Sequence, residues 1–177
     1  MKLTSILLFL TLCCSGHLWA QSKAGGNGNF IYFTMDGTEY KYDTKQVLSY
    51  TREDTAKGKE HKVISAFVRT PDGDSYVKMS IMFYMKLNEG IKPGKLDMYS
   101  ILGYKKKLPC VYISLDKKNG DQYTFYGSKE GNKGSFEVTS VNGDWVEGSF
   151  SLTMPSKYGK EAALEITKGT FKFQIKK

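Results

Sequence analysis

The stretch SYVKMSIMFYMK, residues 75–86, decides the fold class of this chain. Apolar side chains occupy every second position, so an extended backbone directs them to one side and the intervening residues to the other. This period of two indicates a β-strand with one buried face, because an amphipathic helix would repeat every 3.6 residues. The predicted core set is Val77, Met79, Ile81, Phe83 and Met85, and the opposite set is Tyr76, Lys78, Ser80, Met82, Tyr84 and Lys86.

The same alternation continues on both sides of this strand, with turn-forming residues about every eight to twelve positions. Asp36-Gly37 and Asn142-Gly143 are typical of tight hairpin turns, because these residues adopt positive φ angles readily. A longer turn, 117–121, is expected to bring Tyr123 and Phe125 onto the core face. The other predicted strands are 30–35, 38–43, 47–51, 61–70, 110–116 and 122–128, with a loop at 52–60 and a long excursion containing one short strand at 87–108.

The C-terminal third repeats a short pattern in which a glycine stands two residues before a phenylalanine. It occurs as Gly134-Ser135-Phe136, Gly148-Ser149-Phe150 and Gly169-Thr170-Phe171, and each copy opens an alternating stretch. The unequal offsets between the copies exclude a regular solenoid or propeller. Three inward rows are predicted, namely Phe136 with Val138, Phe150 with Leu152 and Met154, and Phe171 with Phe173 and Ile175.

Residues 30–177 are therefore expected to form a single all-β domain. The number and spacing of the strands favour an antiparallel β-sandwich or a partly closed β-barrel of about nine or ten strands. A calycin-like barrel is the alternative form of closure. No amphipathic helix is predicted in this part of the chain.

The first twenty residues have the three parts of a secretory signal peptide. Lys2 supplies the positive charge, residues 3–12 supply an apolar run, and Ala20 is a small residue before Gln21. The run is shorter than the roughly 20 apolar residues that a membrane-spanning helix needs. We expect cleavage between Ala20 and Gln21, a flexible linker over residues 21–29, and export to the periplasm, the cell surface or the medium.

Two cysteines inside this leader leave a second form of export open. A lipoprotein signal is cut before a cysteine that then carries acyl chains, and Cys13 or Cys14 could be that residue. Such signals place a small residue before the modified cysteine, whereas Leu12 precedes Cys13 and another cysteine precedes Cys14. Cleavage at Ala20 is therefore the favoured prediction, and a lipid anchor at Cys13 or Cys14 is the alternative.

Composition excludes several kinds of chemistry. The chain carries a net charge of +8, yet only Arg52 and Arg69 among its cations are arginine. Arginine is the residue that forms bidentate hydrogen bonds with phosphate and guanine. Nucleic-acid binding is therefore not expected. After loss of the leader only Cys110 and His61 remain of their types, too few for an intramolecular disulfide or a Cys/His zinc site.

The remaining chemical candidates have ordinary structural interpretations. Cys110 and His61 could form a nucleophile and base only if the fold joined them, whereas a half-buried cysteine and a solvated histidine at a strand entrance are the expected roles. Asp72 with Asp74, and Asp116 with Asn119 and Asp121, have turn spacing rather than calcium-loop spacing. The lysines 105–107 could contact anionic groups, but such a run is usually solvated.

The twelve tyrosines are more than one core needs. Several aromatic side chains are expected opposite the aliphatic rows, either beneath a second layer or on a recognition surface, because Tyr and Trp combine apolar area with a polar tip. The packing interpretation is favoured. The candidate binding residues are Tyr76, Tyr84, Tyr112, Tyr126 and Trp145.

Three segments are similar to segments of other proteins, namely the hairpin from Phe33 to Tyr40, the stretch VEGSFSLTM at 146–154 and the terminal ITKGTFKFQIKK from Ile166. In these segments the chain resembles small exported β-proteins of uncharacterised families in Gram-negative bacteria. The resemblance implies an all-β envelope protein, and it implies no catalytic or binding residue.

The sequence thus favours a non-catalytic binding or interaction module of the cell envelope. Its ligand could be a small hydrophobic molecule, a glycan or a protein. A structural or assembly component that accepts a partner strand at a sheet edge is the alternative, and a hydrolase comes third. No catalytic residue, metal or cofactor is predicted.

Overall fold

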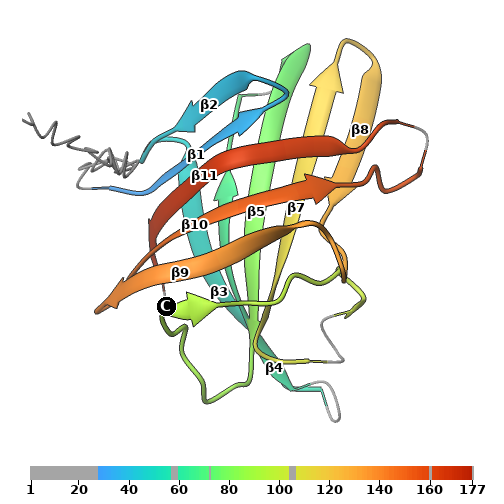
Figure 1. Ribbon diagram of the computed structural model, residues 1–177. Helices are drawn as coiled ribbons and strands as arrows, with labels where there is room; N and C mark the ends of the chain where they lie inside the picture. The colour runs from blue at the N-terminus through green and yellow to red at the C-terminus, as the bar shows by residue number, and fades with distance from the viewer. Residues whose placement is uncertain (1–27, 57–59, 72, 104–106, 160, 177) are drawn as a thin grey trace, which may run out of the picture.

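The structure, a computed structural model, describes residues 28–56, 60–71, 73–103, 107–159 and 161–176. They form eleven strands in two antiparallel sheets, and no α-helix occurs among them (Figure 1). Sheet A has the order β2-β1-β11-β10-β9-β6 and sheet B the order β3-β4-β5-β7-β8. The bounds are β1 Phe30–Met35, β2 Thr38–Tyr42, β3 Val47–Asp54, β4 His61–Val68, β5 Ser75–Met85, β6 Gly94–Lys95, β7 Cys110–Asn119, β8 Gln122–Gly127, β9 Gly134–Asn142, β10 Trp145–Met154 and β11 Leu164–Gln174.

The all-β prediction is confirmed, and the sheets form an open sandwich that does not close into a barrel. The strand count is slightly above the prediction, and β3 runs on to Asp54 because its last residues pair with the start of β4. The described residues hold no helix long and apolar enough to cross a membrane. The leader with Ala20, Gln21, Cys13 and Cys14, and residues 21–27 of the predicted linker, lie outside the described ranges.

Phenylalanine rings fill the space between the sheets. Phe83 of β5 points from sheet B into a cluster on sheet A, with its ring centroid 5.5 Å from that of Phe136 and 5.8 Å from that of Phe173. Phe136 stacks on Phe171 at 5.2 Å and lies 6.3 Å from Phe150. These five rings are buried, so the inward rows predicted from the repeated glycine pattern are confirmed.

The glycines of that pattern make room for the rings of neighbouring strands. Gly148 of β10 lies opposite Phe171 of β11, and Phe150 of β10 lies opposite Gly169 of β11. A Cβ atom at Gly169 would lie 2.6 Å from the ring and from the carbonyl oxygen of Phe150, and one at Gly148 would collide with the Phe171 ring. Each phenylalanine therefore lies over a glycine of its partner strand, and the contact is reciprocal.

A buried asparagine joins the two sheets along one side. The Asn29 amide donates a hydrogen bond to the Val47 carbonyl of β3 at 3.0 Å, and its side-chain oxygen accepts one from the Gln174 backbone NH of β11 at 2.9 Å. The Ser49 hydroxyl of β3 also donates to the Gln174 carbonyl. Asn29, which the sequence analysis assigned to the linker, is thus part of the folded domain.

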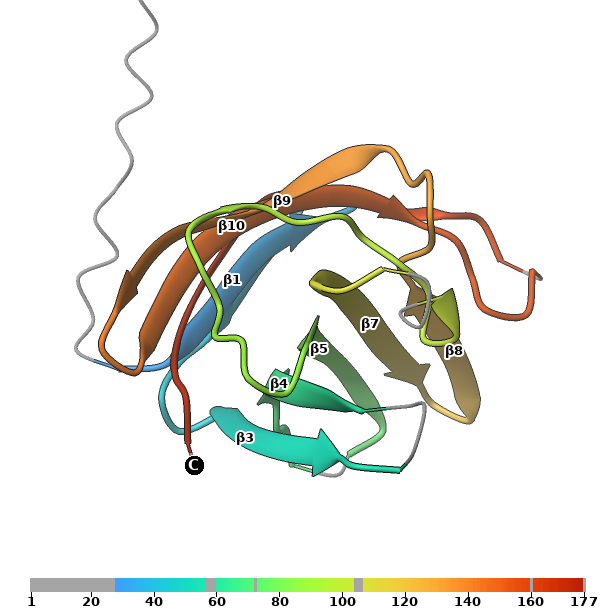
Figure 2. The ribbon, with the colours of Figure 1, turned by 90° about the horizontal axis from the view of Figure 1, so that it is seen from below.

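Two short segments span the opposite side. The chain from Gly94 to Tyr99 crosses between the sheets, since Gly94–Lys95 pairs with β9 while Val111 of β7 donates to the Asp97 carbonyl at 3.0 Å. Figure 2 shows this part of the chain lying across one end of the sandwich. Further along, the backbone NH of Lys157 donates to the Phe125 carbonyl at 2.7 Å, so residues 155–157 cover the outer edge of β8.

The register of the β7–β8 hairpin corrects one prediction. Asn119 pairs with Gln122, which leaves a two-residue turn instead of the predicted five-residue one. Tyr126 then lies opposite Leu115, and directly paired residues share a face, so Tyr126 enters the core. Tyr123 and Phe125 were predicted on the core face and lie on the outer face instead.

We expect Gly169→Ala to lower the free energy of unfolding by about 1–3 kcal/mol, because the added methyl group overpacks the Phe150 contact. Gly90→Ala is the matched control, since a Cβ there has nothing within 4 Å, and its effect should stay within about 0.5 kcal/mol. Chemical denaturation of both variants measures the difference. Equal midpoints for Gly169→Ala and the wild type would contradict the reciprocal packing.

Candidate functional site

The outer face of sheet B is divided into a covered part and an open part. Strand pairing aligns Val63, Tyr84 and Cys110 in one row across β4, β5 and β7, with Met82 and Tyr112 in the next. Toward the start of β5 the rows are open. They are Lys78, Asp116 and Phe125, and then Tyr76, Lys118 and Tyr123, across β5, β7 and β8.

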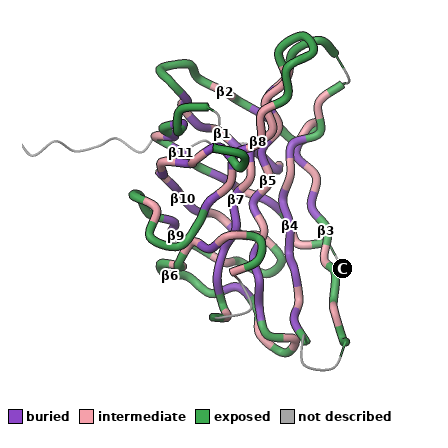
Figure 3. The backbone as a smooth tube through the Cα atoms, turned by 90° about the vertical axis from the view of Figure 1, so that its right-hand side faces the viewer, coloured by how far each residue is buried: buried purple, intermediate pink, exposed green. Residues whose placement is uncertain are grey.

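A second layer covers the first part. Tyr99 from the excursion packs on Tyr84, Tyr112 and Cys110, and Leu108 packs at the side of the same cluster. Tyr84 and Tyr112 retain only 5% and 7% of their exposure. The packing interpretation is therefore confirmed for these two tyrosines. In Figure 3 the long purple stretches of sheet B mark buried residues in its middle, and its upper ends are pink and green.

A buried serine holds this layer in place. The Ser128 hydroxyl donates to the Tyr99 carbonyl at 2.9 Å and accepts from the Ile113 backbone NH at 3.0 Å. Tyr99 in turn donates from its backbone to the Val111 carbonyl at 2.9 Å. Ser128 therefore joins the excursion to β7 just where the pairing of β8 with β7 ends.

Cys110 and His61 lie on this same face, and both are buried. Burial raises the pKa of the Cys110 thiol to about 12, with a smaller contribution from Asp97, so the thiol is neutral at physiological pH. His61 is only 3% exposed, with its ring 5.8 Å from that of Tyr84. The expectation of a solvated His61 was wrong, because β4 begins beneath the covered part.

The open part of the face carries aromatic rings and lysines that are half-buried, with Tyr123 the exposed member. We call the residues Tyr76, Lys78, Asp116, Lys118, Tyr123 and Phe125 the aromatic platform. Tyr123 is 53% exposed. Tyr158, 65% exposed, packs its ring edge-on against Phe125 at 6.2 Å from the strand extension beside β8.

Lysine ammonium groups lie over the rings of the platform and its rim. The Nζ atom of Lys78 is 4.1 Å from the centroid of the Tyr76 ring, and that of Lys118 is 5.3 Å from the Tyr123 centroid. Lys157 lies 5.9 Å from the Tyr158 centroid. Ammonium groups in these positions interact favourably with the negative ring faces.

Two charged groups of the platform have shifted pKa values. A hydrogen bond with Tyr123 is the main cause that raises the pKa of Lys118, which also donates to the Gly73 carbonyl at 3.0 Å. Burial raises the pKa of Asp116 above its ordinary value, while Lys78 and Lys157 act in the opposite direction. Asp116 is therefore a half-buried acceptor in the middle of a basic, aromatic surface.

The structure does not bring the five predicted binding residues together. Tyr84 and Tyr112 lie in the covered part, Tyr76 lies in the platform, and Tyr126 is in the main core. Trp145 lies on the outer face of sheet A, where Lys172 is 5.3 Å from its ring centroid. The position predicted for Tyr126, opposite the aliphatic rows, was wrong for the register reason given above.

Sequence reasoning missed Lys118, Tyr123 and Phe125 as members of a surface. Their alignment with Tyr76 and Lys78 depends on the two-residue turn after Asn119. The Asn119-Gly120 pair was visible in the sequence, and a tight hairpin centred one residue later would have predicted the correct face.

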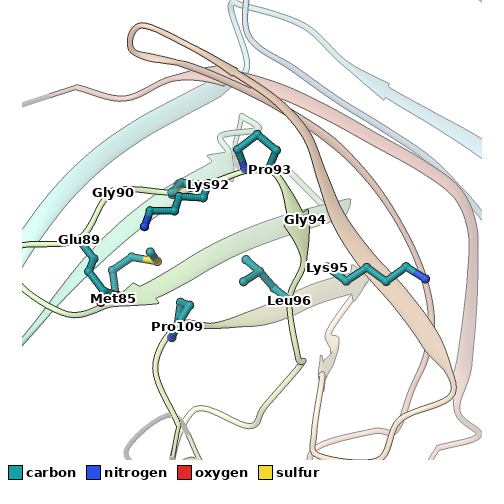
Figure 4. Close-up of a pocket in the computed structure, with 10 residues that line it drawn as sticks. Met85, Glu89, Gly90, Lys92, Pro93, Gly94, Lys95, Leu96 and Pro109 are labelled. Carbon is teal, nitrogen blue, oxygen red and sulfur yellow. The ribbon is translucent and has the colours of Figure 1, made fainter.

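A recess near the crossing segment is a second candidate. It has a volume of about 310 Å³, and Met85, Leu96 and Pro109 line it while Lys92 reaches over it (Figure 4). Lys95 points away from it. Met85 is a buried member of the main core cluster, so this recess adjoins the border of that core.

The other predicted polar groups that the structure describes form no site of their own. Lys107 pairs with Asp97, while Lys105, Lys106 and Asp72 lie outside the described ranges. Among the residues that the structure describes, no group of three or more His, Cys, Asp or Glu side chains could hold a metal ion.

The two parts of the face should respond differently to truncation. Tyr84→Ala should lower the free energy of unfolding by about 3–5 kcal/mol, because it empties a buried aromatic site. Tyr123→Ala should change it by no more than about 0.5 kcal/mol, the usual range for surface positions. Denaturant midpoints of the two variants measure this, and equal losses would show that the platform is also packed.

Cys110 should resist thiol reagents in the folded protein. A pKa of about 12, against an ordinary 9.0, lowers the thiolate fraction at pH 8 by about a thousandfold. Above pH 9 the unfolded thiol ionises and the folded one does not. Stability should then fall relative to Cys110→Ala, by up to about 1.4 kcal/mol per pH unit. Iodoacetamide labelling with and without urea tests the first point, and rapid labelling of folded protein would contradict it.

Comparison of the chain with models of known protein families, with curated proteins and with solved structures found no match.

Proposed function

We propose that this chain is an exported, non-catalytic binding module of a cell envelope, and that it binds through the aromatic platform. The observation that carries this proposal is the contrast within one sheet face. A second layer buries Tyr84 and Tyr112, whereas Tyr123 of the platform and Tyr158 beside it remain more than half exposed. Exposed aromatic rings gathered on one surface are typical of recognition sites.

The filled interior supports a surface site. Phe83, Phe136, Phe171 and Phe173 are almost completely buried between the sheets. A calycin-like protein holds its ligand inside the barrel, and these rings occupy the corresponding space. A ligand of this domain is therefore expected on the outside.

Export is supported by the leader at residues 1–20 and by the resemblance to exported envelope proteins. A non-catalytic role is supported by the neutral, buried Cys110 thiol, since the thiolate is the reactive form of cysteine. The alternative export signal, a lipid anchor at Cys13 or Cys14, would fix the same domain to a membrane and leave the platform unchanged.

Three of the sheet borders give little support to the alternative role in strand-exchange assembly, whereas the fourth, the eight-residue β3, has no strand paired with its outer edge among the described residues. The outer edge of β8 is covered by residues 155–157, and β9 is partly covered by β6. β2 is five residues long and bears the Glu39–Lys41 ion pair, with 2.8 Å between Oε2 and Nζ. Short and charged edge strands resist the addition of a partner strand.

NMR titration of the isotope-labelled mature protein tests the proposal. The probes are polygalacturonate, cellohexaose, an oligothymidine and vesicles of phosphatidylcholine with phosphatidylglycerol. We expect at least one probe to shift the amide signals of Tyr76, Lys118 and Tyr123, and Tyr123→Ala to weaken that binding at least about tenfold, the order expected for a central aromatic contact.

Tyr50→Ala is the matched control, because Tyr50 is a 42%-exposed tyrosine on the same sheet face outside the platform. It should bind like the wild type. Probes that bind only at the recess around Met85 and Leu96, or equal losses in both variants, would contradict a site on the platform.

A further inference from the structure

The platform alternates rings and charges at the spacing of β-strands. Tyr76, Lys118 and Tyr123 lie on three adjacent strands, and adjacent strands are about 4.8 Å apart, so the two rings are separated by roughly 10 Å with an ammonium group between them. A matching ligand is extended and presents flat apolar faces at intervals, with negative groups between them. Compact ligands would use only one ring.

The lysines favour an acidic ligand over a neutral one. Lys78, Lys118 and Lys157 each lie 4.1–5.9 Å from the centroid of a tyrosine ring, and a ligand that stacks on such a ring displaces the ammonium group. A neutral ligand loses these cation–ring contacts without replacement. An anionic ligand restores them as ion pairs with the same lysines, and the net positive charge of the chain favours its approach.

Asp116 favours a ligand rich in hydroxyl groups. Asp116 lies between Lys78 and Phe125 in one of the two rows of the platform, and its carboxylate can accept hydrogen bonds. Sugar hydroxyls are donors on every ring of a polysaccharide. The sugar–phosphate backbone of DNA offers no such hydroxyl donor. The cations over the rings are lysines, whereas nucleic-acid sites favour arginine.

We propose that the aromatic platform binds an extended acidic polysaccharide. Sugar rings stack on Tyr76 and Tyr123, sugar carboxylates pair with Lys118 and Lys78, and a sugar hydroxyl donates to Asp116. This inference names the ligand class of the site described under the proposed function and rests on that function.

A pair of matched ligands tests the charge requirement. Calorimetric titrations compare polygalacturonate with fully methyl-esterified polygalacturonate, which keeps the sugar chain and lacks its charges. We expect at least about tenfold tighter binding of the acidic form, the sum of several exposed ion pairs, and a loss of affinity as salt increases.

Matched variants separate the platform from general attraction to a basic protein. Lys118→Met should weaken binding of the acidic chain by about two- to fivefold, the range for one exposed ion pair, and leave the esterified chain unaffected. Lys45→Met removes the same charge at an exposed position of the β2–β3 connection and should bind like the wild type. Denaturant midpoints of both variants verify that they are folded. Tyr123→Ala, a surface change, should weaken binding of the acidic chain if folding of Lys118→Met fails.

Each contrary outcome has a separate meaning. Equal affinity of the acidic and esterified chains, with shifts at Tyr76 and Tyr123, would overturn the acidic ligand and leave the binding module standing. Tighter binding of the oligothymidine at the same residues would also overturn it, in favour of single-stranded nucleic acid. Equal losses of affinity in Lys118→Met and Lys45→Met would show that binding depends only on the net charge of the protein. Absence of any shift at the platform with every probe would overturn both proposals.

Discussion

In β10 and β11 a phenylalanine ring lies over a glycine of the partner strand in both directions, and the whole sandwich is arranged around this contact. Gly148 and Gly169 leave the inner surface of sheet A without side chains at two points, and the rings of Phe171 and Phe150 occupy those points. With the rings lying low on sheet A, Phe83 of sheet B can reach among them. The distance between the sheets and the density of the core both depend on these two glycines.

Because the interior is filled, a ligand is expected on the outer surface. On that surface the excursion after β5, residues 87–108, determines which side chains are accessible. Its residues cross from sheet A to sheet B, pair with Val111 and are held by the Ser128 hydroxyl. The same backbone interactions that cover one side of the sandwich therefore bury Tyr84 and Tyr112 and leave Tyr76 open. Fold closure and the position of the candidate site have a common cause in this segment.

The candidate site also shows how a local turn determines chemistry at a distance. A two-residue turn after Asn119 sends Tyr126 into the core and places Tyr123 and Phe125 on the outer face beside Lys118 and Asp116. A shift of one residue would exchange the two faces of β8, because side chains alternate along a strand. The aromatic platform would then lose two of its rings.

The sequence by itself determined the strands, the inward rows and the hairpin at Asp36-Gly37, because alternation and positive-φ turn residues are local properties of the sequence. Only the tertiary structure decided which tyrosines are covered, since that depends on where residues 94–99 cross between sheets. It also decided the burial of His61, which lies beside Tyr84 of β5, and the membership of Asn29 in the domain, which arises from its hydrogen bonds to β3 and β11. Such contacts join residues far apart in the chain, and no periodicity within one strand encodes them.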